Sequence, residues 1–161
     1  MFYEIYGLSQ GRDAATVERF LHHFCQRAQL EPLVNQWLQV WTSDGRFLDE
    51  AERPLTSVAE VVSYATAHPT HGFVWYQLHA VRADLHSVLL RFTSDAQVVF
   101  GLCIAERQLD GRDNLSQAQQ LLTELWHVTA AHNGFIAVEY PPAATEAEFE
   151  TDRAMWQMLN K

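Results

Sequence analysis

The hydrophobic pattern predicts the first elements of this chain. The run from Phe2 to Leu8 predicts a short strand. After Asp13, a residue placed to cap a helix, apolar residues recur at intervals of three and four, which predicts a helix with one buried face. Its core-facing positions are Val17, Phe20, Leu21, Phe24, Cys25 and Ala28, and its solvent-facing positions are Glu18, Arg19, His22, His23, Gln26 and Arg27.

The segment from Pro32 to Trp41 fits both periods. Its apolar residues match helical spacing, but they also alternate with polar ones and lead directly into Ser43-Asp44-Gly45, a hairpin-turn signal. We expect a strand from about Trp37 onward.

The chain also repeats its own pattern. Thr42-Ser43-Asp44-Gly45-Arg46-Phe47 matches Thr93-Ser94-Asp95-Ala96-Gln97-Val98, and each copy is followed by a predicted helix and an apolar strand. This pattern predicts two tandem strand-strand-helix-strand units, over about residues 37–81 and 86–140. An ancient duplication and convergence on one plan both explain such a match, and chance is the alternative to either.

Capping signals delimit the later helices. Ser57 to Glu60 forms a capping box before one helix, and Asp113 or Asn114 caps another whose apolar positions run from Leu115 to Trp126. We expect both helices to stop at a glycine, Gly72 and Gly134, before a strand. Pro141-Pro142 ends the sheet. A second capping box, Thr145 to Glu148, opens a final acidic helix over 145–160 that carries Phe149, Trp156 and Leu159 on one stripe.

The strand that follows the second turn is apolar on both faces. Val98, Phe100, Leu102 and Ile104 point one way, and the smaller set Val99, Gly101, Cys103 and Ala105 points the other, where a helix or a partner could approach closely. We therefore predict a single α+β domain over residues 1–161, with a mainly antiparallel sheet and helices packed on one of its faces.

Composition narrows the function classes. The chain has 161 residues, 48% of them hydrophobic, which suits one globular domain and excludes a disordered chain. Eleven Lys and Arg against twenty Asp and Glu give a net charge of -9, which disfavours direct nucleic-acid binding. No apolar run is long enough for a membrane span, and the first residues do not resemble a signal peptide, so we expect a cytoplasmic protein. Cys25 and Cys103 are expected to be buried thiols.

Motifs for catalysis or metal binding are weak. The only lysine is Lys161, the eight histidines show no ligand-like spacing, and there is no nucleophile motif or glycine-rich phosphate loop. We therefore predict no catalytic residues, cofactor or metal. The alternative is a small enzyme or ligand-binding domain with a helix-sheet pocket, using His79, His86 or Glu139 as polar groups.

An interaction surface remains as the main hypothesis. Two acidic loops follow the two matched turns, and equivalent places in a pseudo-two-fold fold would bring them to one edge to steer a basic partner. Trp37, Trp41 and Trp156 are candidate interface anchors, whereas Trp75 and Trp126 are expected in the core. The acidic candidates are Asp44, Asp49, Glu50 and Glu52 in the first loop, and Glu106, Asp110 and Asp113 in the second. The alternative is that these loops are merely solvated, and a homo-oligomeric adaptor using the Trp37-Trp41 edge is a further possibility.

The stretch from Val88 to Phe149 contains an apolar hairpin through Phe100-Gly101-Leu102, a helix, and a strand closing on Glu139-Tyr140-Pro141-Pro142. In this general pattern it resembles the small acidic immunity proteins of bacterial secreted-toxin systems. The resemblance implies a cytosolic, single-domain, non-catalytic protein that binds a cognate toxin, often a basic nuclease, and occludes its active site. It carries no diagnostic motif, so no site residue transfers from it.

Overall fold

The computed structural model describes residues 1–33, 36–42, 46, 48, 53–108, 111 and 113–159. Seven strands and four α-helices follow one another in these residues, together with a 3₁₀ turn at Arg27–Gln29. The strands are β1 Phe2–Ser9, β2 Gln36–Leu38, β3 Arg53–Leu55, β4 Phe73–Gln77, β5 Ser87–Phe92, β6 Val98–Ala105 and β7 Asn133–Val138. The helices are α1 Ala14–Phe24, α2 Val58–Ala67, α3 Leu115–Thr129 and α4 Glu146–Leu159.

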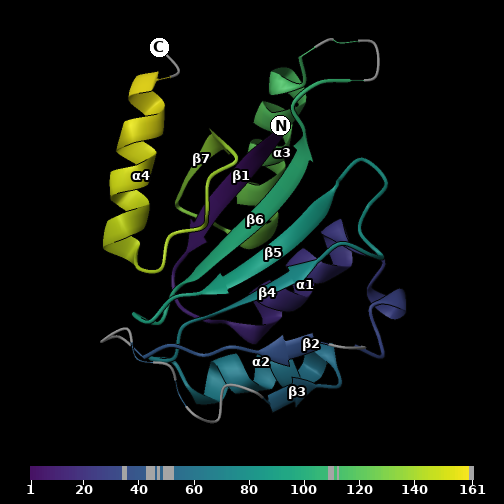
Figure 1. Cartoon of the computed structure of the whole chain (residues 1–161), viewed down its shortest axis with the longest axis vertical. Coiled ribbons are helices and arrows are strands. Elements are labelled where there is room, and N and C mark those ends of the chain that lie inside the picture. The colour runs from purple at the N-terminus through teal and green to yellow at the C-terminus, as the bar shows by residue number, and fades with distance from the viewer. Residues whose placement is uncertain are drawn as a thin grey trace.

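A five-stranded antiparallel sheet organises the molecule (Figure 1). Its strand order is β4-β5-β6-β1-β7, so the N-terminal strand is inserted between strands from the second half of the chain. Strands β2 and β3 form a separate two-stranded sheet beside α2. The α+β fold class predicted from the pattern is therefore confirmed.

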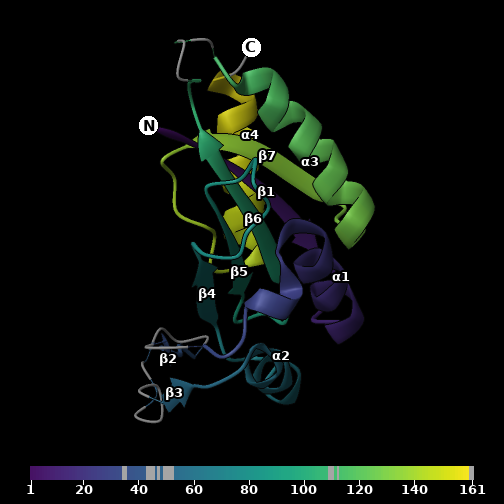
Figure 2. The same ribbon diagram turned by 90° about the vertical axis from the view of Figure 1, so that its right-hand side faces the viewer.

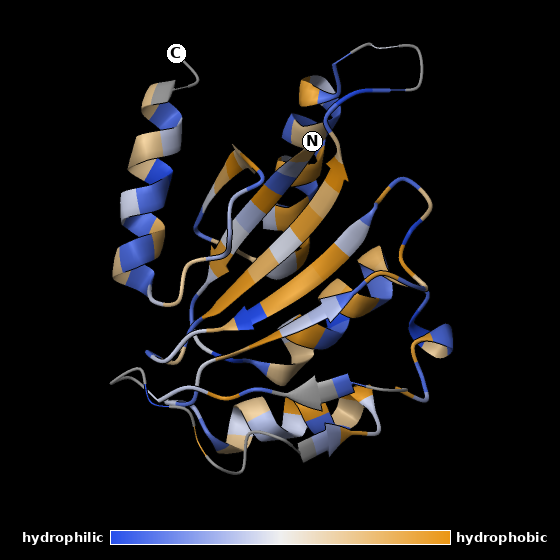
Figure 3. Ribbon diagram, in the orientation of Figure 1, coloured by the Kyte–Doolittle hydropathy of each residue, from blue (hydrophilic) through white to orange (hydrophobic). Residues whose placement is uncertain are grey.

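Helices cover both faces of the large sheet, which corrects the expectation that they cover one. Helices α1 and α3 pack on one face, where Phe20, Leu125 and Phe100 belong to the main core. Helix α4 packs on the other face, where its Phe149 is fully buried beside Phe135. The cause is the doubly apolar character of β5 and β6, which are mostly orange in Figure 3, because both of their faces must be removed from water.

The N-terminal helix begins as its cap predicts and ends earlier than its pattern predicts. The Asp13 carboxylate accepts hydrogen bonds from the main-chain N–H groups of Ala15 and Thr16. Helix α1 stops at Phe24, and Cys25 is still buried there. Ala28, predicted on the core face, lies exposed in the following 3₁₀ turn, because the helical register no longer applies to it.

The order strand-strand-helix-strand does occur twice, as β2-β3-α2-β4 and as β5-β6-α3-β7. The strand pairing differs between the two sets. Strand β4 pairs with β5, whereas β7 crosses to the far side of β1. Strand β2 covers residues 36–38, so it begins close to the predicted start, and the predicted turn at residues 43–45 lies outside the described residues.

The glycines do not end the helices as expected. Helix α3 is followed by Ala130, which itself adopts the left-handed conformation with φ 52°, and helix α2 is followed by His68. Gly134 lies inside β7, where a Cβ atom would fall 2.6 Å from the Trp126 indole nitrogen. Glycine is needed there because the indole packs against the strand backbone.

Gly101 has a similar role inside the sheet, and not the one predicted for it. A Cβ atom at this position would lie 2.5 Å from Cγ of Leu89 on the neighbouring strand β5. The space left by the small residue is therefore filled by a side chain of the sheet itself rather than by a helix or a partner.

Candidate partner-binding groove

Most of the predicted acidic candidates lie outside the described residues: Asp44, Asp49, Glu50, Glu52 and Asp110. Of the remaining two, Asp113 is already engaged. Its carboxylate accepts from the Tyr3 hydroxyl at 3.0 Å and from the Leu115 N–H at 2.6 Å, which ties the start of α3 to β1. Glu106 follows β6, and its main-chain N–H donates to the carbonyl of Met1.

The described ends of the two acidic loops are far apart. Glu106 follows the last residue of β6, and that end of the strand pairs with Phe2. Trp41, before the first loop, pairs with Gly72, which packs against Phe92 and Ser94 near the opposite end of β6. Eight residues of strand separate these ends by about 25 Å. The described stems of the two loops thus lie near opposite ends of β6, and the meeting of the loops at one edge stays a prediction.

The candidate tryptophans occupy different environments. Trp41 is half-buried with its ring 5.0 Å from the Arg91 guanidinium, and Trp156 is half-buried with its ring 5.7 Å from that of Tyr140. The backbone of Trp37 lies in β2, and its side chain is outside the described residues. Trp75 is buried as predicted, and its indole donates to Gln36 at 2.9 Å. Trp126 is 40% exposed, so its prediction as a core residue is wrong.

Trp126 belongs to an elongated hollow at one edge of the large sheet, which we call the β7 groove. The groove has a volume of about 410 Å³ and lies between α3 and α4, which flank β7 on opposite faces (Figure 2). Its lining is mainly apolar: Leu115, Gln119, Leu122, Trp126, Gly134, Phe135, Ile136, Trp156 and Gln157.

Helix α3 presents two apolar stripes, and only one of them is used by the core. Ala118, Leu121 and Leu125 are buried against the sheet. The second stripe, Leu115, Gln119, Leu122 and Trp126, lines the groove, where Leu115 is 38% exposed. This stripe runs from Leu115 to Trp126, twelve residues or about 16 Å of helix, which matches roughly five residues of extended chain. The signal was present in the sequence as an apolar arc wider than one core-facing stripe requires.

The floor of the groove is the unpaired edge of β7. Among the described strands β7 pairs with β1 alone. The N–H of Glu139 donates to the carbonyl of Phe2, which identifies the hydrogen-bonded positions of this ladder. Because bonded and non-bonded pairs alternate along antiparallel strands, the main-chain N–H and C=O groups of Gly134, Ile136 and Val138 point away from β1.

The opposite edge of the sheet is different. There β4 has β2 beside it, and the Gln36 side chain bonds both Trp75 and Gln77 of β4. Near the β7 groove the negative charge of Glu150 is paired with the positive charge of Arg153. The Glu150 carboxylate also accepts a hydrogen bond from the Asn133 amide. The β7 groove therefore combines an open strand edge, apolar walls and little net charge.

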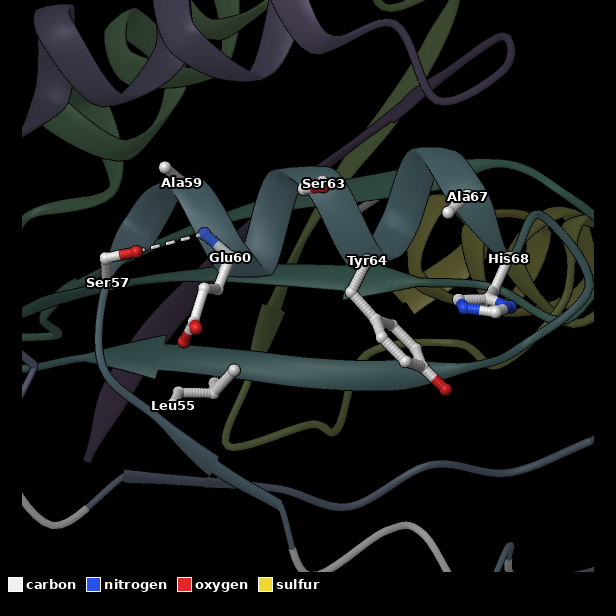
Figure 4. Close-up of a pocket in the computed structure, with 8 residues that line it drawn as sticks. All are labelled: Leu55, Ser57, Ala59, Glu60, Ser63, Tyr64, Ala67 and His68. Atoms are coloured by element: carbon white, nitrogen blue, oxygen red, sulfur yellow. Dashed lines mark hydrogen bonds between the residues drawn. The ribbon is translucent and has the colours of Figure 1, made fainter.

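A second hollow, of about 380 Å³, runs along α2 (Figure 4). Its acidic group, Glu60, serves the start of the helix: its carboxylate accepts from the N–H of Thr56 at 2.8 Å, and its own N–H donates to Ser57. At the other end the Tyr64 hydroxyl lies 2.9 Å from Nδ1 of His71, and the His68 and His71 rings stack at 4.9 Å. These polar groups are used for capping and stacking, so this hollow is the weaker candidate.

Beside α4, a polar chain crosses the sheet at Glu4, Cys103, Ser87 and Tyr76. The Tyr76 hydroxyl donates to Ser87 at 2.9 Å, and Cys103 is the register partner of Ser87 on one side and of Glu4 on the other. Burial raises the pKa of Cys103 to about 12, and burial also raises the pKa of Glu4. The thiol is therefore protonated at neutral pH and is a poor nucleophile.

The residues of the enzyme alternative do not gather. His79 and His86 are exposed, and the His86 ring stacks on Phe2 at 4.4 Å. Glu139 is exposed beside the N-terminal ammonium group at 3.7 Å. None of the three lines either hollow described above.

Within the described residues no cluster of three or more His, Cys, Asp or Glu could hold a metal ion. Over the same residues, no helix has the length and apolar character needed to span a bilayer. Comparison with protein-family models, with curated proteins and with solved structures found no match for this chain.

Proposed function

We propose that this chain is a non-catalytic protein-binding domain, and that it takes up an extended segment of its partner along β7. The open edge of β7, lying between the second stripe of α3 and the C-terminal half of α4, is the observation that carries the proposal. An extended segment would form main-chain hydrogen bonds with Gly134, Ile136 and Val138, while the apolar walls accept alternate side chains.

The recess of the edge favours a single strand over a second copy of the chain. Helices α3 and α4 both contribute side chains to the groove walls, so β7 lies at the bottom of a hollow. Two such edges would bring helix against helix before their strands could pair. A partner segment of about five residues with apolar side chains at alternate positions fits this space.

The resemblance to immunity proteins supplies a specific form of this proposal: a bacterial, cytoplasmic toxin inhibitor. The net charge of -9 supports a basic partner, because such a surface speeds association with one. Occlusion of a toxin active site by the acidic loops remains a prediction, and the loop ends that are described lie at opposite ends of the sheet. The first candidate partner to test is the product of the adjacent gene. Binding of that product to this chain should be measured, and cells that express the product should be protected when this chain is expressed with it.

Hydrogen exchange on the complex with that protein tests the groove. We expect slower exchange in β7 and on the groove side of α3. Two variants should weaken binding at least about ten-fold. Trp126→Glu places a charge in the apolar wall, and Ile136→Pro removes an N–H that faces away from β1.

Leu78→Glu is the matched control, because Leu78 is a large apolar residue that is 48% exposed and lies outside the groove. Urea unfolding of each variant separates lost binding from lost stability. If hydrogen exchange in the complex slowed at Glu106 and Asp113 and stayed unchanged in the β7 groove, the groove would be refuted as the binding site.

A further inference from the structure

A third hollow, of about 220 Å³, contains the guanidinium of Arg91, from which no described residue accepts a hydrogen bond. Its residues come from segments far apart in the chain, at the end of the sheet where α4 begins. The lining is Trp41, Thr42, Gly72, Arg91, Ser94, Ala144, Thr145 and Glu148. We call this the Arg91 pocket. None of these residues lines the β7 groove.

Main-chain hydrogen bonds hold the walls of the Arg91 pocket in place. Trp41 and Gly72 exchange two of them, each 2.7 Å long, and the N–H of Ser94 donates to the Ala144 carbonyl at 3.3 Å. The pocket is therefore built by ladder-type contacts between segments and does not depend on side-chain packing alone.

The guanidinium of Arg91 has no hydrogen bond or ion pair with any described residue. Its Nε atom is buried, and its side chain is half-buried on β5. Burial lowers the pKa of Arg91, but the group remains charged at neutral pH. Because a buried N–H group without an acceptor is costly, an acceptor for the Nε–H of Arg91 is expected.

The geometry selects the kind of acceptor. The Trp41 ring lies 5.0 Å from the guanidinium carbon and covers one side of the group. In-plane N–H groups are then left for an acceptor of matching shape, and a guanidinium fork matches two oxygens of an oxyanion. The Ser94 hydroxyl, which forms no hydrogen bond with a described residue, is a second donor in the same pocket.

Glu148 discriminates between anions. It is an exposed residue of the lining, its carboxylate accepts from the N–H of Ala144 at 2.8 Å, and it forms no ion pair with Arg91 in the described structure. Its negative charge opposes a doubly charged ligand more strongly than a singly charged one. A carboxylate therefore suits the pocket better than a phosphate.

We propose that the Arg91 pocket binds a carboxylate group, held by Arg91 on its two oxygens and assisted by the Ser94 hydroxyl. This site is independent of the proposed binding of a partner segment at β7. The carboxylate could belong to a small organic acid or to the end of a peptide chain, and the two sources share this chemistry.

Acetate titration followed by NMR of the whole chain tests the site. We expect the Arg91 Nε–H and Trp41 indole N–H signals to shift saturably, with a dissociation constant on the order of 10 mM, and inorganic phosphate at equal ionic strength to bind more weakly. Acetylglycine and its amide distinguish the two sources. If acetylglycine binds with higher affinity than acetate, and its amide does not bind, the natural ligand is the end of a peptide chain. If acetylglycine and acetate bind with equal affinity, the natural ligand is a small organic acid.

Arg91→Lys keeps the charge but loses the fork, so acetate should bind roughly ten-fold more weakly, as read from the Trp41 signal. Glu148→Gln removes the opposing charge and should strengthen binding. Arg153→Lys, on α4 outside the pocket, is the control and should leave it unchanged. Absence of a saturable shift in the native protein, or an unchanged affinity in Arg91→Lys, would overturn the proposal.

Discussion

Arg12 shows how one side chain joins segments that are distant in the sequence. Its guanidinium donates to the carbonyl of Ala65 in the last turn of α2, to those of His68 and His71 after α2, and to that of Thr93 after β5. Burial lowers the pKa of Arg12 to about 10, so the group remains protonated at neutral pH. One cation therefore satisfies carbonyls at the end of α2 that the helix itself cannot.

We expect Arg12→Ala to lower the free energy of unfolding by about 2–4 kcal/mol, because several carbonyls lose a charged donor at once. Arg12→Lys should recover part of this loss. Urea denaturation measures both changes. Arg153→Ala, which removes a cation paired with Glu150 within one helix, serves as the control and should change the stability by less than about 0.5 kcal/mol. Equal losses for the Arg12 and Arg153 variants would contradict the joining role.

At the scale of elements, α3 is attached to its neighbours by an ionic network. Glu124 of α3 accepts from Arg82 at 2.8 Å and lies 2.6 Å from His23 of α1. Arg82 also bonds Asp84 and lies 5.0 Å from the Phe24 ring. The hydrogen bond from Arg82 lowers the pKa of Glu124 from 4.5 to about 2.

A carboxylate whose pKa is lower in the folded state stabilises the protein above its unfolded pKa. This contribution is complete above about pH 4.5 and is lost as the pH falls toward about 2. Glu124→Gln should therefore be less stable than the native protein at neutral pH, with the difference narrowing in acid. Unfolding free energies measured across this range check the expectation. A difference that stays constant down to pH 2 would contradict it, and Glu106→Gln, which breaks no described ion pair, is the control.

At the scale of the whole molecule, the two cysteines report on whether both cores unfold together. Cys25 follows α1 in the main core, and Cys103 lies in β6 beside the polar chain with Glu4 and Ser87. Both thiols are buried, as predicted, and burial raises the pKa of each to about 12. Neither thiol is accessible or ionised in the folded protein at neutral pH.

If residues 1–161 form one cooperative domain, as the sequence predicts, both thiols should react with a disulfide reagent only on global unfolding. We expect labelling at pH 8 to be at least about a thousand-fold slower in the native protein than in urea. Mass spectrometry along a urea series should give the same midpoint for Cys25 and Cys103. Two separate midpoints would show that the parts of the molecule unfold independently.

Most of the local structure could be predicted from the residues alone, because caps and periodicity act between near neighbours. Asp13, Ser57 and Thr145 cap the helices predicted for them, and the alternation from Val98 to Ala105 correctly predicted a strand apolar on both sides. Only the tertiary structure decided which element covers each face and where β1 is inserted, since strand pairing between distant residues has no local signal.

The candidate sites depend on the same difference. Leu115, Leu122 and Trp126 look like core residues in the sequence, and they line a groove only because α3 already buries its other stripe and β7 lies at the edge. Among the described residues Arg91 lacks a hydrogen-bond acceptor only because the fold brings Trp41 and Glu148 to its pocket without placing a carboxylate oxygen in hydrogen-bond contact with it. Side-chain chemistry can be predicted from sequence, but exposure and the absence of a partner are properties of the assembled fold.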